Sequence, residues 1–253
     1  RRRGGHVMSP FATFCLRMGD NALILGQRTG EWCGHAPVLE EDIAFANMGL
    51  DLIGQTQLWY GMVSDELGKS PDDLAFFRGE REFLNTLLVE QPNTDFAHAL
   101  MRQYLFDAWH LPMLDGLTGS TNADVAALAE KSVKEVRYHI DRSRDLIVRL
   151  GDGSPESHDR MQAALDWLWP FTADLLARDA ADDTLVAEGM IPAAAPVQQA
   201  FDWETAETFA RATLTAPDGP RRTGGRTGNH SEHMGYLLAV MQSVPRAHPG
   251  AHW

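Results

Sequence analysis

The sequence predicts an all-α protein whose core is a bundle of four long helices. Apolar residues recur at helical spacing in one segment after another of the 253-residue chain. No segment of convincing length shows the alternating pattern of a strand, and no hairpin dipeptide joins β-branched runs. The four longest helical segments form two pairs separated by a long connection, which is the plan of a four-helix bundle with a crossover.

The first pair of helices is predicted over residues 10–32 and 39–68. Pro10 suits a first helical turn, and Gly34 suits a stop. The acidic residues 40–42 place negative charge where the dipole of the second helix favours it. We expect this second helix to bury one stripe, made of Ile43, Asn47, Leu50, Asp51, Gly54, Leu58 and Met62.

The second pair is predicted over residues 94–117 and 122–150. Thr94 is a candidate N-cap for the first of these helices. Pro112 lies inside it and should kink it. Gly151 follows the second helix of the pair as a stop signal.

Shorter helices are expected beside the bundle. One opens near Ser70, one begins at Ser154 and Pro155, and two more are predicted over residues 203–214 and 230–242. The stretch from 179 to 202 is Ala- and Pro-rich, and residues 216–229 are rich in Gly and Pro, which is typical of a mobile loop. We expect one domain over residues 10–253, preceded by a flexible extension, residues 1–9.

Charge and composition exclude several classes of protein. The chain has 22 basic and 35 acidic residues, a net charge of −13, which opposes binding to nucleic acid. No apolar run approaches the ~20 residues that span a bilayer, and no signal peptide is evident. Two cysteines, Cys15 and Cys33, are too few for a disulfide scaffold, so we expect both reduced in a helical core. Together these features predict a cytoplasmic protein.

Acidic residues within the predicted apolar stripes indicate the di-iron site of ferritin-like bundles. In such sites two helices each give one carboxylate, and the other two each give a carboxylate and a His three residues later. That spacing puts both ligands on one helix face. In this chain Asp51 is followed by Gly54, which has no donor atom. Glu135 is followed by Tyr138, a poor ligand for a divalent metal at neutral pH.

Asp107 and His139 do not restore the ligand set. Asp107 occupies the single-carboxylate position, and His139 lies four residues after Glu135 rather than three. We expect the carboxylates to form a salt-bridged polar core, with Lys131 or Arg142 beside Glu135 and with Asp107 and Glu135 close together. No metal, cofactor or catalytic residue is expected in this chain, and the vestigial ligand positions are Asp51, Gly54, Asp107, Glu135, Tyr138 and His139.

Two alternatives remain open from the residues alone. One is an active di-iron oxygenase or oxidase with an unusual ligand set, formed by Glu31 or Gln27, Asp51, Asp107, Glu135 and His139. The other is a free-standing helical scaffold. A further cluster, His230-Ser231-Glu232-His233, has the look of a metal clip, but a helix cap and a surface pair explain it equally well.

Several segments resemble the non-catalytic C subunit family of bacterial phenylacetyl-CoA epoxidase complexes. The resemblance covers the chain from about residue 10 to Trp253. The segments that carry it are Thr29–His35, Leu39–Ala44 with Asn47, Leu50–Gln55, Leu88–Asn93, Phe96–His98, Phe106–His110, Lys134–His139, Leu150–Gly153 and Glu232–Leu238.

The resemblance implies a ferritin-like fold and a role in phenylacetate catabolism. The family's complex uses dioxygen and NADPH to epoxidise the ring of phenylacetyl-CoA. A homologous catalytic partner, the A subunit, holds the di-iron site, and a separate reductase supplies electrons. This chain would then be a structural component that pairs with the catalytic partner and stabilises it. It could also contact the reductase and a small accessory subunit, or form a homodimer when alone.

Overall fold

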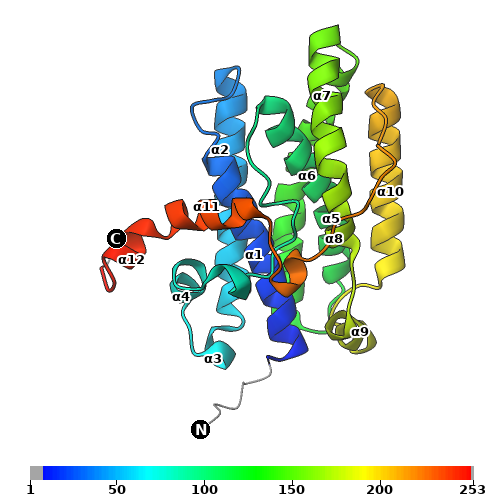
Figure 1. Ribbon diagram of the computed structural model, residues 1–253. Coiled ribbons are helices and arrows are strands. Elements are labelled where there is room, and N and C mark those ends of the chain that lie inside the picture. The colour runs from blue at the N-terminus through cyan, green and yellow to red at the C-terminus, as the bar shows by residue number, and fades with distance from the viewer. Residues whose placement is uncertain (1–7, 252–253) are drawn as a thin grey trace.

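A computed structural model describes residues 8–251, and this part of the chain is all-α (Figure 1). Four long helices form the bundle: α1 (Pro10–Gly30), α2 (Leu39–Gly61), α5 (Phe96–Leu117) and α6 (Ala123–Gly151). The all-α prediction and the two helix pairs are confirmed. Residues 1–7 of the expected N-terminal extension lie outside the described residues.

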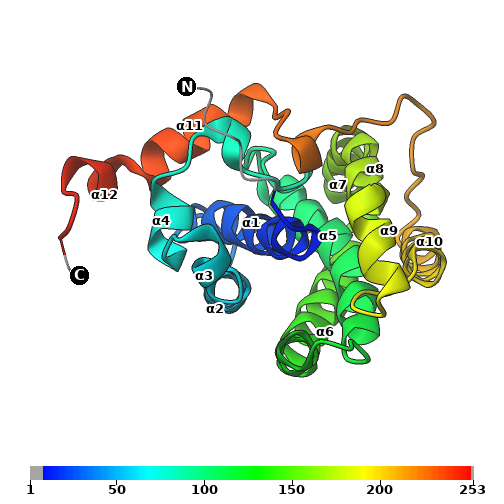
Figure 2. The same cartoon turned by 90° about the horizontal axis from the view of Figure 1, so that it is seen from below.

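Shorter helices lie on several sides of the bundle. Between α2 and α5 the chain forms α3 (Ser64–Leu67), α4 (Pro71–Phe76) and a 3-10 turn, η1 (Glu80–Glu82). After α6 it forms α7 (Pro155–Leu168), η2 (Trp169–Phe171), α8 (Thr172–Leu176), α9 (Ala180–Ala187), α10 (Ala194–Arg211), η3 (Gly225–Thr227), α11 (Glu232–Met241) and α12 (Ser243–Ala247). Figure 2 shows α2 and α6 along the lower edge, whereas α7 to α10 lie to the right and α11 lies above.

Local capping chemistry decides where the long helices begin. The side chains of Ser9 and Asn122 accept hydrogen bonds from backbone N–H groups in the first turns of α1 and α6. Asp95, rather than the predicted Thr94, caps α5 by accepting from the N–H of His98. The α5 helix then continues through Pro112 to Leu117.

Two segment predictions were wrong. The second helix ends at Gly61 rather than near residue 68. The stretch from 179 to 202 contains α9 and the first turns of α10, which begins at Ala194 rather than at 203. Asp179 starts α9 through a capping box with Asp182. Pro196 fits α10 because it lies in the first turn, where a backbone N–H has no partner within the helix.

The buried face of α2 also differs from the predicted stripe. Ile43, Leu50 and Leu58 are 52%, 70% and 41% exposed. The face that packs into the bundle instead contains Phe45, Met48, Leu52, Gln55, Trp59 and Tyr60. The helix is therefore apolar on two sides, and the sequence pattern alone could not say which side faces α1.

The two cysteines differ in environment. Cys15 is buried in α1 as predicted, but Cys33 is exposed in the α1–α2 connection, so the prediction of a core position was wrong there. No helix within residues 8–251 is long and apolar enough to cross a membrane.

Candidate functional site

The predicted site residues meet, in part, in a polar cluster inside the four-helix bundle. We call this the interior polar cluster and define it as Asp51 and Gln55 on α2, Gln103 and Asp107 on α5, and Glu135 and His139 on α6.

Asp107 is the most deeply buried carboxylate of the cluster. It is fully buried, and its Oδ2 accepts a hydrogen bond from Gln103 Nε2, one turn earlier, at 2.9 Å. Its Oδ1 has no hydrogen-bond partner within residues 8–251. Burial raises the pKa of Asp107 to about 7, although the nearby His139 acts to lower it. Asp107 is therefore poised between its neutral and charged forms near neutral pH.

The side chain of His139 on α6 is hydrogen-bonded to Asp51 on α2. Its side chain is buried, and its Nε2 lies 2.9 Å from Oδ2 of Asp51. Because an ionised carboxylate can only accept, Nε2 donates in this bond. The side chain of Asp51 is 37% exposed, so this end of the cluster reaches the protein surface.

Glu135 joins the same two helices one turn away. Its Oε2 accepts from Gln55 Nε2 at 3.1 Å, and its Oε1 lies 3.8 Å from Lys131 Nζ. The predicted partner Lys131 is thus confirmed. The other predicted partner, Arg142, pairs with Glu41 at 2.7 Å instead. Asp107 and Glu135 take different partners, and no hydrogen bond joins them.

The two positions at which the template expects His add no donor to the cluster. Gly54 has open space beside it, since a Cβ added there would meet no atom within 4 Å. Tyr138 is 53% exposed on the outer side of α6. The structure therefore does not bring Gly54 and Tyr138 together with the buried carboxylates.

His110 is a further imidazole in the bundle interior. It is buried on α5 and packs beside Phe106 and Trp109, with ring centroids 4.8 and 6.0 Å away. Burial lowers the pKa of His110 to about 3, with His139 acting in the same direction, so it is neutral at physiological pH. Its Nδ1 has no hydrogen-bond partner within the described chain.

These residues do not fit a di-iron centre. Within residues 8–251, no group of three or more His, Cys, Asp or Glu side chains is arranged to hold a metal ion. Two bridged metals require several carboxylates and two imidazoles in one shell. The carboxylates here are held by Gln and His, and Glu31 of the alternative ligand set pairs with Arg28 at 2.9 Å.

Other buried charges were missed at the sequence level. Asp20 on α1 is fully buried, and Arg78 and Tyr60 both donate to it. Their separation along the chain gives no local pattern. Arg17 on α1 likewise pairs with Asp179, the N-cap of α9, and with Asp182 in the first turn of that helix.

Of the His230–His233 cluster, His230 is buried, so the interpretation as a surface pair does not hold for this residue. The side chains of His230 and Glu90 are both fully buried, with Nδ1 2.8 Å from Oε2. The other nitrogen of His230, Nε2, donates to the carbonyl oxygen of Phe83 at 2.9 Å. Burial lowers the pKa of His230, but Glu90 outweighs it, and the pKa is raised overall. Both ring nitrogens thus hold the segment before α11 to the connection between α4 and α5.

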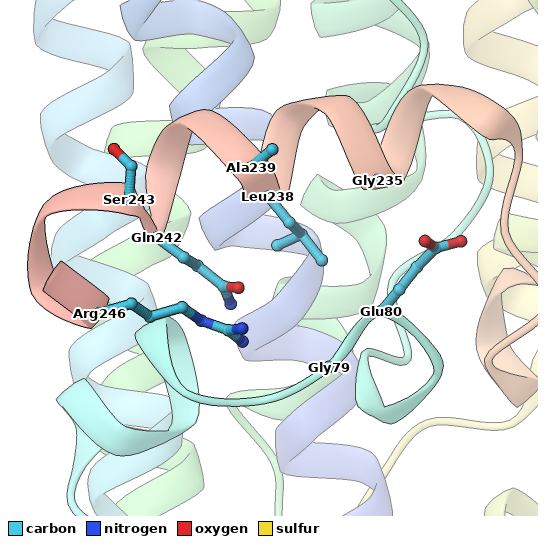
Figure 3. A pocket seen from close by; sticks show the side chains of 8 residues that line it. All are labelled: Gly79, Glu80, Gly235, Leu238, Ala239, Gln242, Ser243 and Arg246. Atoms are coloured by element: carbon cyan, nitrogen blue, oxygen red, sulfur yellow. The ribbon is translucent and has the colours of Figure 1, made fainter.

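A shallow depression lies beneath the C-terminal helices, separate from the interior polar cluster. It has a volume of about 270 Å³ and lies between α11, α12 and the turn at Gly79 and Glu80 (Figure 3). Gln242 on its wall donates to the carbonyl oxygens of Ala75 and Arg78. None of its lining residues belongs to the interior polar cluster.

Comparison with known proteins gives concordant results. A family model described as phenylacetic acid catabolic protein matches residues 6–253. The chain is 44% identical over 248 residues to the C subunit of 1,2-phenylacetyl-CoA epoxidase from Escherichia coli strain K12. That match covers 97% of this chain and 100% of the relative.

Proposed function

This chain belongs to the family of phenylacetic acid catabolic proteins, and on that basis we propose that it is a non-catalytic subunit of a phenylacetyl-CoA epoxidase. In this role it pairs with a catalytic di-iron subunit and stabilises it during aerobic phenylacetate catabolism in the cytoplasm. A reductase and a small accessory subunit are the other proposed components of the complex.

One observation carries the non-catalytic assignment. The interior polar cluster keeps carboxylates at the expected positions, but Gly54 and Tyr138 contribute no donor to it. The carboxylates are instead hydrogen-bonded within the protein, because Gln103 donates to Asp107 and Gln55 donates to Glu135. Each of these carboxylates thus has a donor within the protein, and Asp107 can meet the remaining cost of its burial by binding a proton rather than a metal ion, since burial raises its pKa to about 7.

A helical bundle that lacks a catalytic metal site can still support the reaction of its partner. Catalysis requires the reacting groups to be held to within a fraction of an ångström, and a rigid neighbour restricts the movement of the active helices. The densely packed bundle of this chain supplies such a neighbour. Dioxygen activation and substrate binding would then belong to the catalytic subunit.

Iron content and variant activity test the proposal. We expect the purified chain to hold far less than one iron per molecule by elemental analysis, with no di-iron absorbance. In the assembled complex, Asp107→Asn with Glu135→Gln should leave NADPH-dependent epoxidation within about twofold of wild type. A variant with a catalytic-subunit iron ligand replaced is the matched control and should lose activity.

The alternative, a self-sufficient di-iron oxygenase, predicts the reverse. Two irons per chain, oxygen-dependent turnover by the chain alone, and loss of that turnover in the Asp107→Asn variant would overturn the proposed function.

A further inference from the structure

The C-terminal helices form an arm that lies across the long helices rather than along them (Figure 1). We define the C-terminal arm as residues 230–247, which comprise α11, α12 and the two residues before α11. Its inner face buries Met234, Leu237 and Leu238 against the bundle. Because only these three side chains of α11 are buried, the polar contacts at the two ends of the arm contribute to its attachment.

His230 attaches the beginning of the arm through both of its ring nitrogens. Nδ1 lies 2.8 Å from Oε2 of Glu90, and Nε2 lies 2.9 Å from the carbonyl oxygen of Phe83. A carbonyl oxygen can only accept, so Nε2 carries a hydrogen. The partner of Nδ1 is a carboxylate, which also can only accept when it is ionised. Two such acceptors around one imidazole require both nitrogens to donate, which makes the ring positively charged.

The surroundings of Glu90 favour its ionised form. Its side chain is fully buried, and each of its oxygens accepts from a neutral donor. Oε1 accepts from the N–H of Ser231 at 2.6 Å, and Oε2 accepts from Asn85 Nδ2 at 3.0 Å. Hydrogen bonds to a carboxylate stabilise its charged state. The proton between the two side chains is therefore assigned to His230.

The other charged groups around His230 do not substitute for this proton. Glu80 on η1 adds negative charge, which favours the protonated ring, as Glu90 does. Arg28 on α1 donates to the backbone carbonyl oxygen of Glu90 rather than to its carboxylate. Asp174 on α8 accepts from the backbone at residues 224 and 225, before the arm begins. Loss of the proton would leave the lone pair of Nδ1 facing a buried carboxylate that has no charged donor.

The far end of the arm is held by groups that do not titrate near neutral pH. Gln242 donates to the carbonyl oxygens of Ala75 and Arg78. Arg246 donates to those of Phe76 and Arg78. An amide carries no charge, and a guanidinium keeps its proton. A change in protonation therefore acts on the beginning of the arm and not on its end.

We propose that the ion pair of His230 and Glu90 is a pH-dependent anchor, which holds the beginning of the C-terminal arm on the bundle while His230 is protonated and detaches when the proton is lost. A buried carboxylate without its charged donor is strongly unfavourable. Burial lowers the pKa of His230, but the nearby carboxylates outweigh it and raise the pKa above its ordinary value. The anchor is therefore fully stabilising below pH ~6.5, and its contribution is lost as pH rises through the raised pKa. The inference does not depend on the proposed function.

Hydrogen exchange measured by mass spectrometry tests the anchor on the whole chain, after correction for the intrinsic effect of pH on exchange. We expect the protection of the amides of α11 to fall by about tenfold per pH unit between pH ~6.5 and the raised pKa of His230. The internal control is α10, which contains no histidine and should not lose protection in the same way.

Two variants identify the responsible side chain. His230→Gln keeps a polar group but cannot become charged, so we expect low protection of α11 that no longer depends on pH. Far-UV circular dichroism verifies that the variant keeps its helices. The matched control is His233→Gln on the same helix, where the residue accepts a hydrogen bond through its backbone carbonyl oxygen rather than its ring. This control should retain the wild-type pH dependence.

Three results would overturn the pH-dependent anchor, and none of them requires a variant. One is constant protection of α11 in the wild-type chain from about pH 6 to 9. Another is an equal loss of protection in α10, because the whole bundle would then be opening. The third is an NMR titration that finds the ring of His230 neutral at about pH 6, because the proton would then belong to Glu90.

Discussion

At the scale of single residues, burial makes the contribution of Asp107 to stability depend on pH near neutrality. Its pKa is raised to about 7 by burial, whereas an Asp in the unfolded chain titrates near 3.9. Between these values the folded state binds more protons than the unfolded state. The contribution of Asp107 to the free energy of unfolding is therefore fully present below pH ~4 and is lost as pH rises toward 7.

The substitution Asp107→Asn should remove this dependence. Asn keeps a carbonyl oxygen to accept from Gln103 and carries no charge to desolvate. We expect the variant to match wild type at pH 4 and to exceed it by about 1–3 kcal/mol in free energy of unfolding at pH 8. Urea titrations at the two pH values measure this. Equal stability of the two proteins at both pH values would show that Asp107 is not held neutral by its surroundings.

At the scale of helices, two glycines lie in opposite environments: Gly19 in a tight contact and Gly54 beside open space. Gly19 on α1 lies against Tyr60, and a Cβ there would approach Tyr60 Cε1 to 2.5 Å. Tyr60 cannot move away easily because it donates to Asp20 and accepts from Arg78. Gly54 on the same pair of helices faces open space.

The two Gly→Ala variants should therefore change stability in opposite directions. Gly19→Ala should cost about 1–3 kcal/mol in free energy of unfolding through overpacking. Gly54→Ala should gain about 0.5–1 kcal/mol, because alanine favours the helix and meets nothing. Chemical denaturation of the isolated chain compares them. A destabilised Gly54→Ala variant would mean that this face is covered in the isolated chain.

The helices that sequence predicted well are those started by local chemistry. Asn122 and the pair Ser154 and Pro155 mark the beginnings of α6 and α7, because a capping side chain acts within its own turn. The buried face of α2 was wrong because both of its faces are apolar, and the choice between them is made by α1. The beginning of α10 was predicted too late because the Pro-rich stretch around Pro196 was interpreted as non-helical. Proline is tolerated in a first helical turn, which is where Pro196 lies.

Only the carboxylate positions of the candidate site could be predicted from the sequence. The i, i+3 template located Asp51, Asp107 and Glu135, since their spacing follows from helix geometry. It could not identify Gln55 and Gln103 as their hydrogen-bond donors, because glutamine is common on any helix. Contacts between distant segments, such as His230 with Glu90, have no local sequence signal at all.

At the scale of the whole molecule, buried polar contacts tie the C-terminal segment to the bundle. Asp174 on α8 is almost fully buried and accepts backbone hydrogen bonds from Leu87, Gly224 and Gly225 at 3.0, 3.1 and 3.0 Å. One carboxylate thus joins α8, the α4–α5 connection and the loop before α11. The segment from 216 to 229, predicted to be mobile, is held at this point.

Because three segments depend on Asp174, its loss should affect the molecule as a unit. Asp174→Ala would leave three N–H groups without an acceptor, those of the buried Leu87 and Gly225 and the half-buried Gly224, and should cost about 3 kcal/mol in free energy of unfolding. Trypsin cleavage after Arg222 and Arg226 should accelerate. Asp183→Ala, at an exposed acid on α9, is the control and should change neither quantity.

If residues 10–253 form one domain, tryptophan fluorescence and circular dichroism of the wild-type chain should report one coincident urea transition. Two separated transitions would instead divide the C-terminal helices from the bundle as an independent unit.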